Sequence, residues 1–335
     1  KLQLQTWRDF NKLKKINVGN ILEENTTVPS SIEKFEGKSR AYIEIQQGCD
    51  HRCTFCIIPY GRGNNRSVPA GEIITKIKNF VKNGYNEVVL TGVDITDYGK
   101  DLPAKPTFSN LIGRILKLVP ELKQLRLSSI DCAEIDIDFW DVLKDKRLMP
   151  HFHISLQAGN NMILKRMKRR HSREMAIEFC KNVLSIREDA TFGADIIAGF
   201  PTETEEMFLD SIRLVDECQL THLHVFPYSP RDKTPASRMP QLDKNTIKER
   251  AKRLREKGFE KLEENLKNKI GKKELILIEN NKDNISLGKD QNFIKVKIGE
   301  QIKEGKIIFL KWKYNSQLNT KKPKTLMRTK KISQL

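Results

Sequence analysis

The chain has 335 residues, a formal net charge of +18, 38% hydrophobic residues and 31% charged residues. This length has room for one large domain and a small one, and it buries enough surface to hold a core without disulfides. No apolar run approaches the ~18 residues that span a bilayer. The first ten residues, KLQLQTWRDF, lack the apolar stretch of a secretory signal. These features argue against a membrane protein or a secreted disulfide scaffold, and we expect a cytoplasmic monomer with no membrane partner.

The central part of the chain alternates between strand-like and helix-like segments. Residues 1–37 have weak periodicity and are predicted to be a linker or the remnant of an upstream domain. Six extended runs follow, separated by segments with helical periodicity: Tyr42–Gln46, Glu87–Thr91, Gln124–Ser129, Phe152–Gln157, Phe192–Ala198 and His222–Phe226. This alternation predicts a parallel sheet with right-handed crossovers, either an open doubly wound sheet or an incomplete barrel.

Small, polar or turn-forming residues follow the carboxyl end of every predicted strand. In chain order they are GCDHRCTFC, TGVD, SID, LQAGNN, GFPTET and PYSPR. In a barrel all of these ends meet at one mouth, whereas an open sheet brings together only those beside its switch point. We therefore favour an α/β fold with a partial parallel (β/α)6 barrel over residues 38–268.

Two of the intervening helices have recognisable ends. The first is predicted to begin near Pro69 and to end at Asn83-Gly84. Before the last of them, Thr202 and Glu205 have the spacing of a capping box.

The pattern changes after the sixth strand. Lys244–Lys269 is predicted to be a long, highly charged helix that is interrupted at Gly258. Three short alternating runs follow and predict a small antiparallel β domain over residues 270–335: Glu274–Ile278, Phe293–Val296 and Ile307–Trp312.

Positive charge is concentrated at the C-terminal end. Residues 261–335 contain 19 Lys or Arg and 8 Asp or Glu, a net charge of +11 that leaves +7 for the preceding 260 residues. Four aromatic residues are interleaved with these charges: Phe293, Phe309, Trp312 and Tyr314. A solvated surface is one explanation, but a basic module of this kind favours a nucleic acid partner.

Three of the six cysteines, Cys49, Cys53 and Cys56, fall within eight residues after the first strand. Clustered cysteines in a reducing compartment are typical of metal sites. The other three are scattered and are predicted to be small apolar core residues: Cys132, Cys180 and Cys218.

Three kinds of site compete for the clustered cysteines. A structural zinc site needs four ligands, usually in two separated pairs; no second pair is present, although His51 offers a fourth ligand. A cysteine nucleophile would leave two thiols unexplained. A four-iron cluster held by three thiolates leaves one iron open for a substrate or cofactor. We favour the iron–sulfur site because the loop follows the first strand of a βα repeat.

Cys-x3-Cys-x2-Cys after a first barrel strand resembles the signature of radical S-adenosylmethionine (SAM) enzymes. The longer segments IQQGCDHRCTFCIIPYGRGNNRSVPAGEI, LTGVDITDYG, HISLQAGNNMILKRMKRRH and FGADIIAGFPTETEEMF resemble the methylthiotransferases, in particular those acting on N6-threonylcarbamoyladenosine in tRNA. The resemblance covers about residues 38–260. The basic C-terminal module resembles the TRAM domain with which these enzymes hold RNA.

The resemblance implies the cofactors, partners and reaction. A [4Fe-4S] cluster would bind SAM at its open iron, and one electron from a flavodoxin or ferredoxin would release a 5′-deoxyadenosyl radical. The radical would take hydrogen from carbon 2 of the adenine, a methylthio group would be inserted, and a second SAM would supply the methyl. The RNA partner would be the tRNA anticodon stem-loop.

The resemblance also implies cofactor contacts, for which turn chemistry, capping or internal hydrogen bonding is the alternative: Gly92, Asp94, Gln157, Asp195, Gly199 and Thr202. A basic segment after the fourth strand is either a solvated helix face or a contact to tRNA phosphates: Lys165, Arg166, Lys168, Arg169 and Arg170.

The sequence departs from the family in one respect. Family members hold a second [4Fe-4S] cluster with three more cysteines in an N-terminal domain, and no cysteine precedes Cys49 here. Because the chain also lacks an initiator Met, we expect that this domain is missing by truncation. We also expect the chain alone to cleave SAM but to be incomplete for sulfur insertion.

Two alternatives to this function remain open. One is a sister methylthiotransferase that acts on another modified tRNA adenosine or on a ribosomal protein. The other is a non-enzymatic RNA-binding module with a structural metal. No phosphate-binding loop is found, so a nucleotide hydrolase is not supported.

Overall fold

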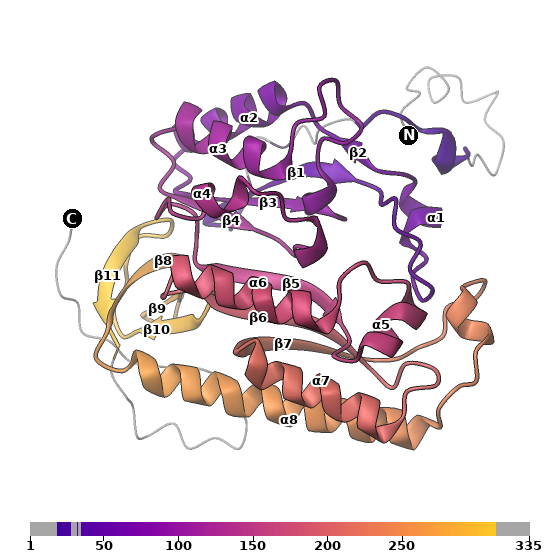
Figure 1. Ribbon diagram of the computed structural model, residues 1–335. Helices are drawn as coiled ribbons and strands as arrows, with labels where there is room; N and C mark the ends of the chain where they lie inside the picture. Colours follow the sequence, from indigo (N-terminus) through magenta and orange to yellow (C-terminus); the bar gives the residue numbers. More distant parts are fainter. Residues whose placement is uncertain (1–18, 28–31, 33–34, 313–335) are drawn as a thin grey trace, which may run out of the picture.

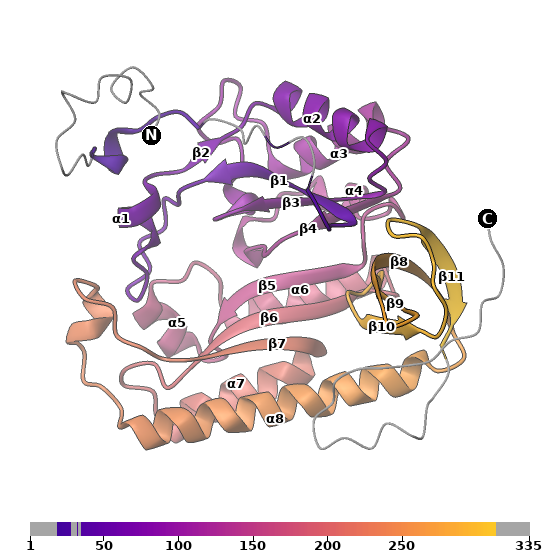
Figure 2. The same cartoon turned by 180° about the vertical axis from the view of Figure 1, so that it is seen from behind.

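The computed structural model describes residues 19–27, 32 and 35–312 of the chain. Six parallel strands curl into a half-barrel, helices cover its outer face, and a small antiparallel sheet lies against one end (Figure 1, Figure 2). The predicted partial barrel is therefore confirmed. The predicted linker over 1–37 lies mostly outside the described residues. Within the described part of the chain, no helix is both long and apolar enough to cross a bilayer.

The half-barrel strands agree with the six predicted runs to within two residues at each end. Their bounds are β1 Arg40–Gln47, β3 Glu87–Gly92, β4 Gln124–Leu127, β5 His151–Gln157, β6 Thr191–Ala198 and β7 Leu220–Pro227, and a short strand, β2 Arg66–Ser67, lies beside β1. They form two sheets, β2-β1-β3-β4 and β5-β6-β7, in which only β1 and β2 are antiparallel. Ile130 joins the sheets, because its N–H donates to the carbonyl of His153 and its carbonyl accepts from the N–H of Ser155, both at 2.9 Å.

Residues alternate between the two faces of each strand, as the period of a β-strand requires. On β6, Phe192, Ala194 and Ile196 are buried in the core beneath the helices, and Gly193 and Asp195 lie on the inner face. The three scattered cysteines are buried core residues, as predicted: Cys132, Cys180 and Cys218. Apolar positions thus face the helices, and polar positions line the inside of the half-barrel.

The helices and short 3-10 turns fill the connections between strands. Their bounds are α1 Ile58–Arg62, α2 Ala70–Lys82, α3 Phe108–Leu118, α4 Phe139–Val142, α5 Asn161–Met167, α6 Arg173–Ile186, α7 Glu205–Glu217, α8 Lys244–Lys269, η3 Ile21–Glu23, η4 Ile95–Asp97, η5 Cys132–Glu134 and η6 Pro235–Arg238. Helix α2 begins after Pro69 and ends at Asn83, as predicted.

Helix α7 begins later than its predicted capping box. Thr204 is the N-cap, and its side chain accepts a hydrogen bond from the N–H of Met207. Thr202 has a φ of +68°, a left-handed conformation, whereas an N-cap is typically extended. The prediction that Thr202 and Glu205 form a capping box is therefore wrong.

Helix α8 has the predicted bounds, but it is not interrupted at Gly258. Gly258 is buried against Leu223 of β7, where a Cβ atom would lie 3.0 Å from the leucine side chain. The glycine allows the helix to approach the strand closely, and its weak helix propensity does not break a helix of 26 residues.

The C-terminal sheet is antiparallel, as predicted, with the order β10-β9-β8-β11. Its strands are β8 Lys273–Lys282, β9 Ile285–Asp290, β10 Lys295–Ile298 and β11 Ile307–Lys311. Strand β9 was not predicted because its buried positions are Ser286, Gly288 and Asp290, so no apolar alternation marks it.

The aromatic residues of this module do not form the RNA-facing set that the sequence suggested. Trp312 is 2% exposed and belongs to the core of the C-terminal sheet, and Phe309 is half-buried. Phe293 packs against the half-barrel, and Tyr314 lies outside the described residues. The expectation that aromatics are interleaved for nucleic acid contact is therefore wrong for Trp312 and Phe293.

The C-terminal sheet closes the amino-terminal end of the half-barrel. The ring of Phe293 stacks on His151 at the start of β5, with a centroid distance of 6.0 Å and an interplanar angle of 9°. The Arg126 guanidinium lies 4.8 Å and the Lys289 ammonium 3.4 Å from the centroid of the Phe293 ring. The opposite end, where the strands terminate, is left open for the cysteine loop.

Candidate active site at the mouth of the half-barrel

The three clustered cysteines lie in the loop between β1 and α1. The loop leaves β1 at Gly48, which has a φ of +72° and on which a Cβ atom would clash with the backbone of Asn64. Its far side is fixed to the end of α5, where the Thr54 hydroxyl donates to the carbonyl of Arg166 at 2.8 Å and the Thr54 N–H donates to that of Met167 at 3.0 Å. The loop is thus held at both ends across the mouth.

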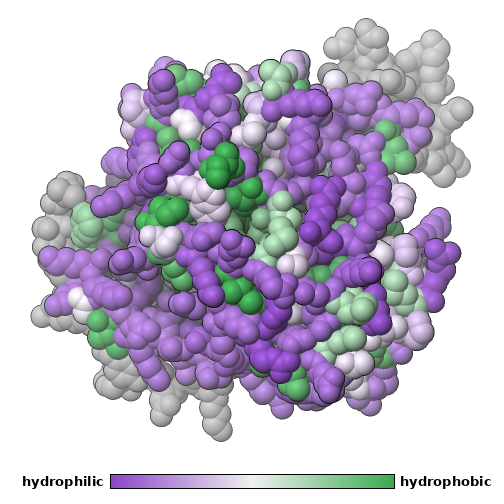
Figure 3. All heavy atoms as spheres, in the orientation of Figure 1, coloured by the Kyte–Doolittle hydropathy of each residue, from purple (hydrophilic) through white to green (hydrophobic). Residues whose placement is uncertain are grey.

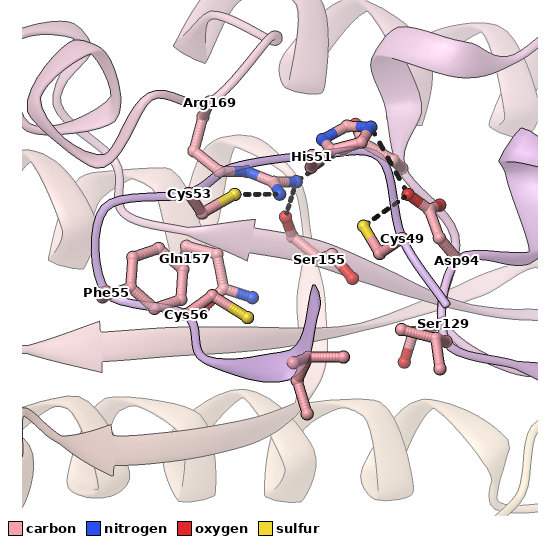
Figure 4. A pocket seen from close by; sticks show the side chains of 13 residues that line it. Cys49, His51, Cys53, Phe55, Cys56, Asp94, Ser129, Ser155, Gln157 and Arg169 are labelled. Carbon is pink, nitrogen blue, oxygen red and sulfur yellow. Dashed lines mark hydrogen bonds and ion pairs between the residues drawn. The ribbon is translucent and has the colours of Figure 1, made fainter. Parts of the chain in front are cut away.

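The thiols of Cys49, Cys53 and Cys56 line one cavity at this mouth, and none forms a disulfide (Figure 4). The remainder of the wall is partly polar and partly apolar: His51, Phe55, Ile58, Val93, Asp94, Ser129, Asp131, Ser155, Gln157 and Arg169. This wall contains three thiols and no fourth cysteine. The donor set fits a four-iron cluster with one iron left for a cofactor.

His51 is not positioned as a fourth ligand of a structural zinc. Its Nε2 atom lies 3.0 Å from the carboxylate of Glu134 and 3.4 Å from that of Asp94. Burial lowers the pKa of His51, but its hydrogen bonds to Cys53 and Glu134 raise it to about 10. A histidine held between two carboxylates favours the charged form, which cannot bind a metal.

Arg169 is the second cation beside the cysteines. Its guanidinium donates to the Asp131 carboxylate at 2.6 Å, to the Ser155 carbonyl at 2.8 Å and to the Cys53 sulfur at 3.7 Å (Figure 4). Burial raises the pKa of the Cys53 thiol, but hydrogen bonds from His51 and Arg169 and the charge of Arg169 outweigh it, and the net shift is downward. These contacts ease deprotonation of Cys53 toward the form that binds iron, whereas burial raises the pKa of Cys49 and that of Cys56.

Arg169 was predicted to lie on a solvated helix face or to contact tRNA phosphates, and both predictions are wrong because its side chain is only 8% exposed. Helix α5 ends at Lys168 in a left-handed conformation, which turns the next residue inward. Arg166 donates to the Thr202 hydroxyl at 2.8 Å. Lys165, Lys168 and Arg170 are exposed, and Arg170 also pairs with Glu134 at 2.8 Å.

The other predicted cofactor contacts fall into two groups. Asp94 and Gln157 line the cysteine cavity, and Gly92 lies beside it, where a Cβ atom would approach the carbonyl of Gln46 to 2.8 Å. Burial and the nearby charge of Glu134 raise the pKa of Asp94 to about 6.

The second group lies away from the cavity wall. Asp195 accepts hydrogen bonds from two histidines within the half-barrel. Gly199 packs against Ile247 of α8, and its N–H donates to the Glu203 carboxylate at 3.0 Å. Thr202 accepts from Arg166, as described above. A cofactor role for these residues stays a prediction.

Comparison with known proteins agrees with this geometry. The radical SAM superfamily model matches residues 43–215. The chain belongs to the radical SAM superfamily.

Relatives of known function identify a narrower family within the radical SAM superfamily. It is 54% identical over 294 residues to the threonylcarbamoyladenosine tRNA methylthiotransferase MtaB of Rickettsia prowazekii, covering 88% of this chain and 69% of the relative. It is 37% identical to MtaB of Bacillus subtilis, covering 71% and 53%, and 36% identical to the tRNA-2-methylthio-N(6)-dimethylallyladenosine synthase of Shouchella clausii, covering 69% and 45%. The chain thus belongs to the tRNA methylthiotransferase family, and it spans between about half and two thirds of these relatives.

Among solved structures, the Escherichia coli coproporphyrinogen III oxidase HemN, a radical SAM enzyme, superimposes with a TM-score of 0.48 at 19% identity. The match covers 66% of this chain and 53% of HemN.

Seven residues of this cavity wall were not predicted as cofactor contacts: Phe55, Ile58, Val93, Ser129, Asp131, Ser155 and Arg169. Ser155 could have been found, because it lies two residues before Gln157 and so shares the inner face of β5. Arg169 could not, because its direction depends on the left-handed turn at Lys168.

Proposed function

We propose that this chain carries the radical-generating core and the RNA-binding module of a methylthiotransferase that modifies carbon 2 of N6-threonylcarbamoyladenosine beside the tRNA anticodon. The observation that carries the proposal is the convergence of three thiols of one loop on a cavity lined by Asp94, Gln157 and Arg169. The 54% identity to a relative of that name, against 36% to a dimethylallyladenosine enzyme, supports this substrate.

Cys49, Cys53 and Cys56 would hold three irons of a [4Fe-4S] cluster, and SAM would bind the fourth. When bound, these cofactors supply one-electron cleavage of a carbon–sulfur bond, which activates an unreactive carbon. The chain itself supplies the surroundings. Arg169 is held by Asp131 beside Cys53 and places a positive charge next to the thiolates.

The apolar side of the cavity protects the reaction. Phe55, Ile58 and Val93 form this side, and we propose that a bound cofactor and RNA cover Ile58 and Val93, each 41% exposed, and so exclude water. Ser129, Ser155 and Gln157 offer hydrogen bonds from the strand ends on the other side. The site thus combines polar groups that orient a cofactor with apolar groups that exclude solvent.

RNA binding is proposed for the C-terminal module, residues 270–335, which we assign as TRAM-like. Its exposed lysines include Lys272, Lys273, Lys282, Lys295, Lys303 and Lys311. The face seen in Figure 3 is mostly hydrophilic, with only scattered apolar side chains. Phosphate contacts from lysines give affinity without sequence specificity, so the choice of nucleotide falls to the half-barrel.

Sulfur insertion and the supply of the electron need groups other than those of this chain. We propose that sulfur insertion needs a second [4Fe-4S] cluster in an N-terminal domain, consistent with relatives that extend beyond this chain. We further propose that a flavodoxin or ferredoxin supplies the electron and that the enzyme acts as a cytoplasmic monomer.

The cluster is tested by anaerobic reconstitution. The chain should bind about four irons and release 5′-deoxyadenosine from SAM with dithionite. Replacing Cys53 with Ala should abolish both, and replacing the buried Cys180 with Ala should abolish neither. Zinc without iron would refute the radical mechanism, and about eight irons would refute a single cluster.

The substrate is tested by hydrogen transfer, which does not depend on sulfur insertion. An anticodon stem-loop carrying deuterium at carbon 2 of threonylcarbamoyladenosine should yield deuterated 5′-deoxyadenosine. A stem-loop deuterated at carbon 8 is the control and should yield none. Deuterium transfer from a ribosomal protein instead would favour the sister function, and no SAM cleavage in a cluster-loaded sample would favour the non-enzymatic module.

A further inference from the structure

A second polar group lies inside the half-barrel, on three neighbouring strands. His153 of β5 and His224 of β7 both bond to Asp195 of β6: His153 Nε2 lies 2.9 Å and His224 Nδ1 3.1 Å from the same carboxylate oxygen. His153 precedes Ser155, a residue of the cysteine cavity, by two positions on β5. At about 3.3 Å per residue, the group therefore lies roughly 7 Å from that cavity along the strand.

Gly193 makes this arrangement possible. A Cβ atom on Gly193 would lie 2.5 Å from Nδ1 of His153 and 3.2 Å from the carbonyl of His222. Because the middle strand has no side chain there, the imidazole of His153 lies over β6 and reaches His224 across it. The two ring centroids are 4.6 Å apart.

The group faces the open side of the half-barrel. Strand β7 pairs with β6, and no strand among the described residues pairs with its other edge. The side chain of His224 is 64% exposed, although it is hydrogen-bonded to Asp195. Phe226 lies two residues further on the same face of β7 and is 51% exposed, which is unusual for an aromatic ring on the inside of a barrel.

The same hydrogen bonds shift the pKa values of Asp195 and His224. Burial raises the pKa of Asp195, but hydrogen bonds from His153 and His224 outweigh it and lower the pKa to about 2. The hydrogen bond to Asp195 raises the pKa of His224. Nδ1 of His224 faces Asp195, so Nε2 is directed away from the carboxylate; in the protonated ring, the form that the Asp195 carboxylate stabilises, Nε2 carries a proton and is a donor.

An exposed aromatic ring beside a fixed donor is the arrangement with which proteins hold an unstacked base. The substituent on the proposed substrate ends in a carboxylate and a hydroxyl, whereas a dimethylallyl group is a hydrocarbon. A hydrogen-bond donor distinguishes these two substituents much more strongly than an apolar contact does.

We propose that Phe226 stacks on the target adenine and that His224 donates from Nε2 to the threonyl group on N6, with Asp195 and His153 as positioning residues. This inference rests on the proposed function. It assigns the choice of substituent to the edge strand β7, and it separates that choice from the cysteine cavity and from the basic C-terminal module.

The test compares three anticodon stem-loops of one sequence, with threonylcarbamoyladenosine, dimethylallyladenosine or adenosine at the modified position. The reconstituted chain should bind the first most tightly in a fluorescence anisotropy titration. His224→Leu should weaken that binding about tenfold, the loss of one charge-assisted hydrogen bond. The variant should bind the dimethylallyladenosine and adenosine stem-loops as tightly as the wild type does, so the preference for threonylcarbamoyladenosine disappears.

Three further variants separate recognition from damage to the fold. Phe226→Leu should weaken the binding of all three RNAs by a similar factor, because the adenine ring of each would stack on Phe226 in the same way. Phe259 on α8 is a phenylalanine of similar exposure, and Phe259→Leu should leave the affinity for each of the three RNAs unchanged. His224→Gln, which keeps a donor, should retain part of the preference, and thermal melting confirms that each variant is folded.

Two results would overturn the inference. One is an unchanged preference for threonylcarbamoyladenosine in folded His224→Leu; the other is stoichiometric zinc or iron bound to His153, Asp195 and His224 when the three clustered cysteines are replaced by Ala. Deuterium transfer by the wild-type chain decides the proposed function separately. If transfer occurs while His224→Leu keeps the preference, the inference alone is wrong.

Discussion

His222 lies two residues before His224 on the same face of β7, and its side chain is half-buried. Its ring centroid is 4.8 Å from that of His151, and its Nδ1 atom lies 2.9 Å from the Thr221 hydroxyl. Burial, with the nearby cationic side chains of Lys269 and Lys289 among the further causes, lowers the pKa of His222 to about 4. The unfolded chain therefore binds a proton between about pH 6.5 and pH 4 that the folded chain does not.

The free energy of unfolding should accordingly fall as the pH is lowered through this window, by about 3 kcal/mol for His222 alone. Urea denaturation at several pH values between 4 and 7 measures the slope. His222→Gln should reduce the slope without abolishing it, because burial also lowers the pKa of His151 and that of His171. A slope that is the same in the variant and the wild type would contradict this assignment.

Single residues also show which features of the site can be predicted from sequence. The spacing of Cys49, Cys53 and Cys56, together with their position after the first strand, predicts an iron–sulfur site, and the structure places the three thiols on one cavity as that chemistry requires. Arg169 looked like its neighbours in a basic run, because no local pattern reveals the left-handed turn at Lys168 that buries it. A motif of closely spaced chemical groups can thus be predicted from the sequence, whereas the direction of a side chain after an irregular turn cannot.

At the scale of elements, two mid-helix glycines should respond oppositely to substitution. A Cβ atom on Gly258 of α8 would already lie only 3.0 Å from the side chain of Leu223, so Gly258→Leu should overpack the contact with β7 and destabilise the chain by about 1–3 kcal/mol. On Gly113 of α3, a Cβ atom would make an ordinary 3.5 Å contact with Val142, so Gly113→Ala should stabilise by up to about 1 kcal/mol.

Denaturation midpoints of the two variants test this pair, and destabilisation by both would show that α3 is also packed against its neighbour too closely for a methyl group.

Gly258 also explains an error of prediction. Helix propensity marks Gly258 as a break, but the close approach of α8 to β7 needs a residue without a side chain there, and packing outweighs propensity. Similarly, Thr202 matched a capping box by spacing, while its backbone conformation leaves the capping to Thr204.

At the scale of the whole molecule, the cysteine cavity and the proposed RNA-binding module lie at opposite ends of the half-barrel. The cysteine loop lies at the carboxyl ends of the strands, and the basic C-terminal sheet covers the amino ends (Figure 1, Figure 2). One RNA that contacts both must therefore extend along the open side, past the exposed inner face of β7 at His224 and Phe226. This arrangement is functional only if the C-terminal sheet holds a fixed position on the half-barrel.

Phe293 is the residue that fixes it. Its ring contacts His151, Arg126 and Arg40 across the junction, and a phenylalanine with a φ of +68° is held in this conformation by its surroundings. Phe293→Ala removes these contacts and should lower the unfolding free energy of the C-terminal sheet by about 2 kcal/mol.

Because the contact is made across the junction, the loss should appear as separate unfolding of the two parts. Hydrogen exchange should speed up in β9 and β10 while the core of β6 stays protected. Phe309→Ala removes an equivalent ring from β11, away from this junction, and should destabilise the sheet without exposing the amino end of β5. Equal exchange at the start of β5 in the two variants would mean that Phe293 does not hold the junction, and that other contacts across it, such as the ion pair of Arg40 with Glu279, hold it instead.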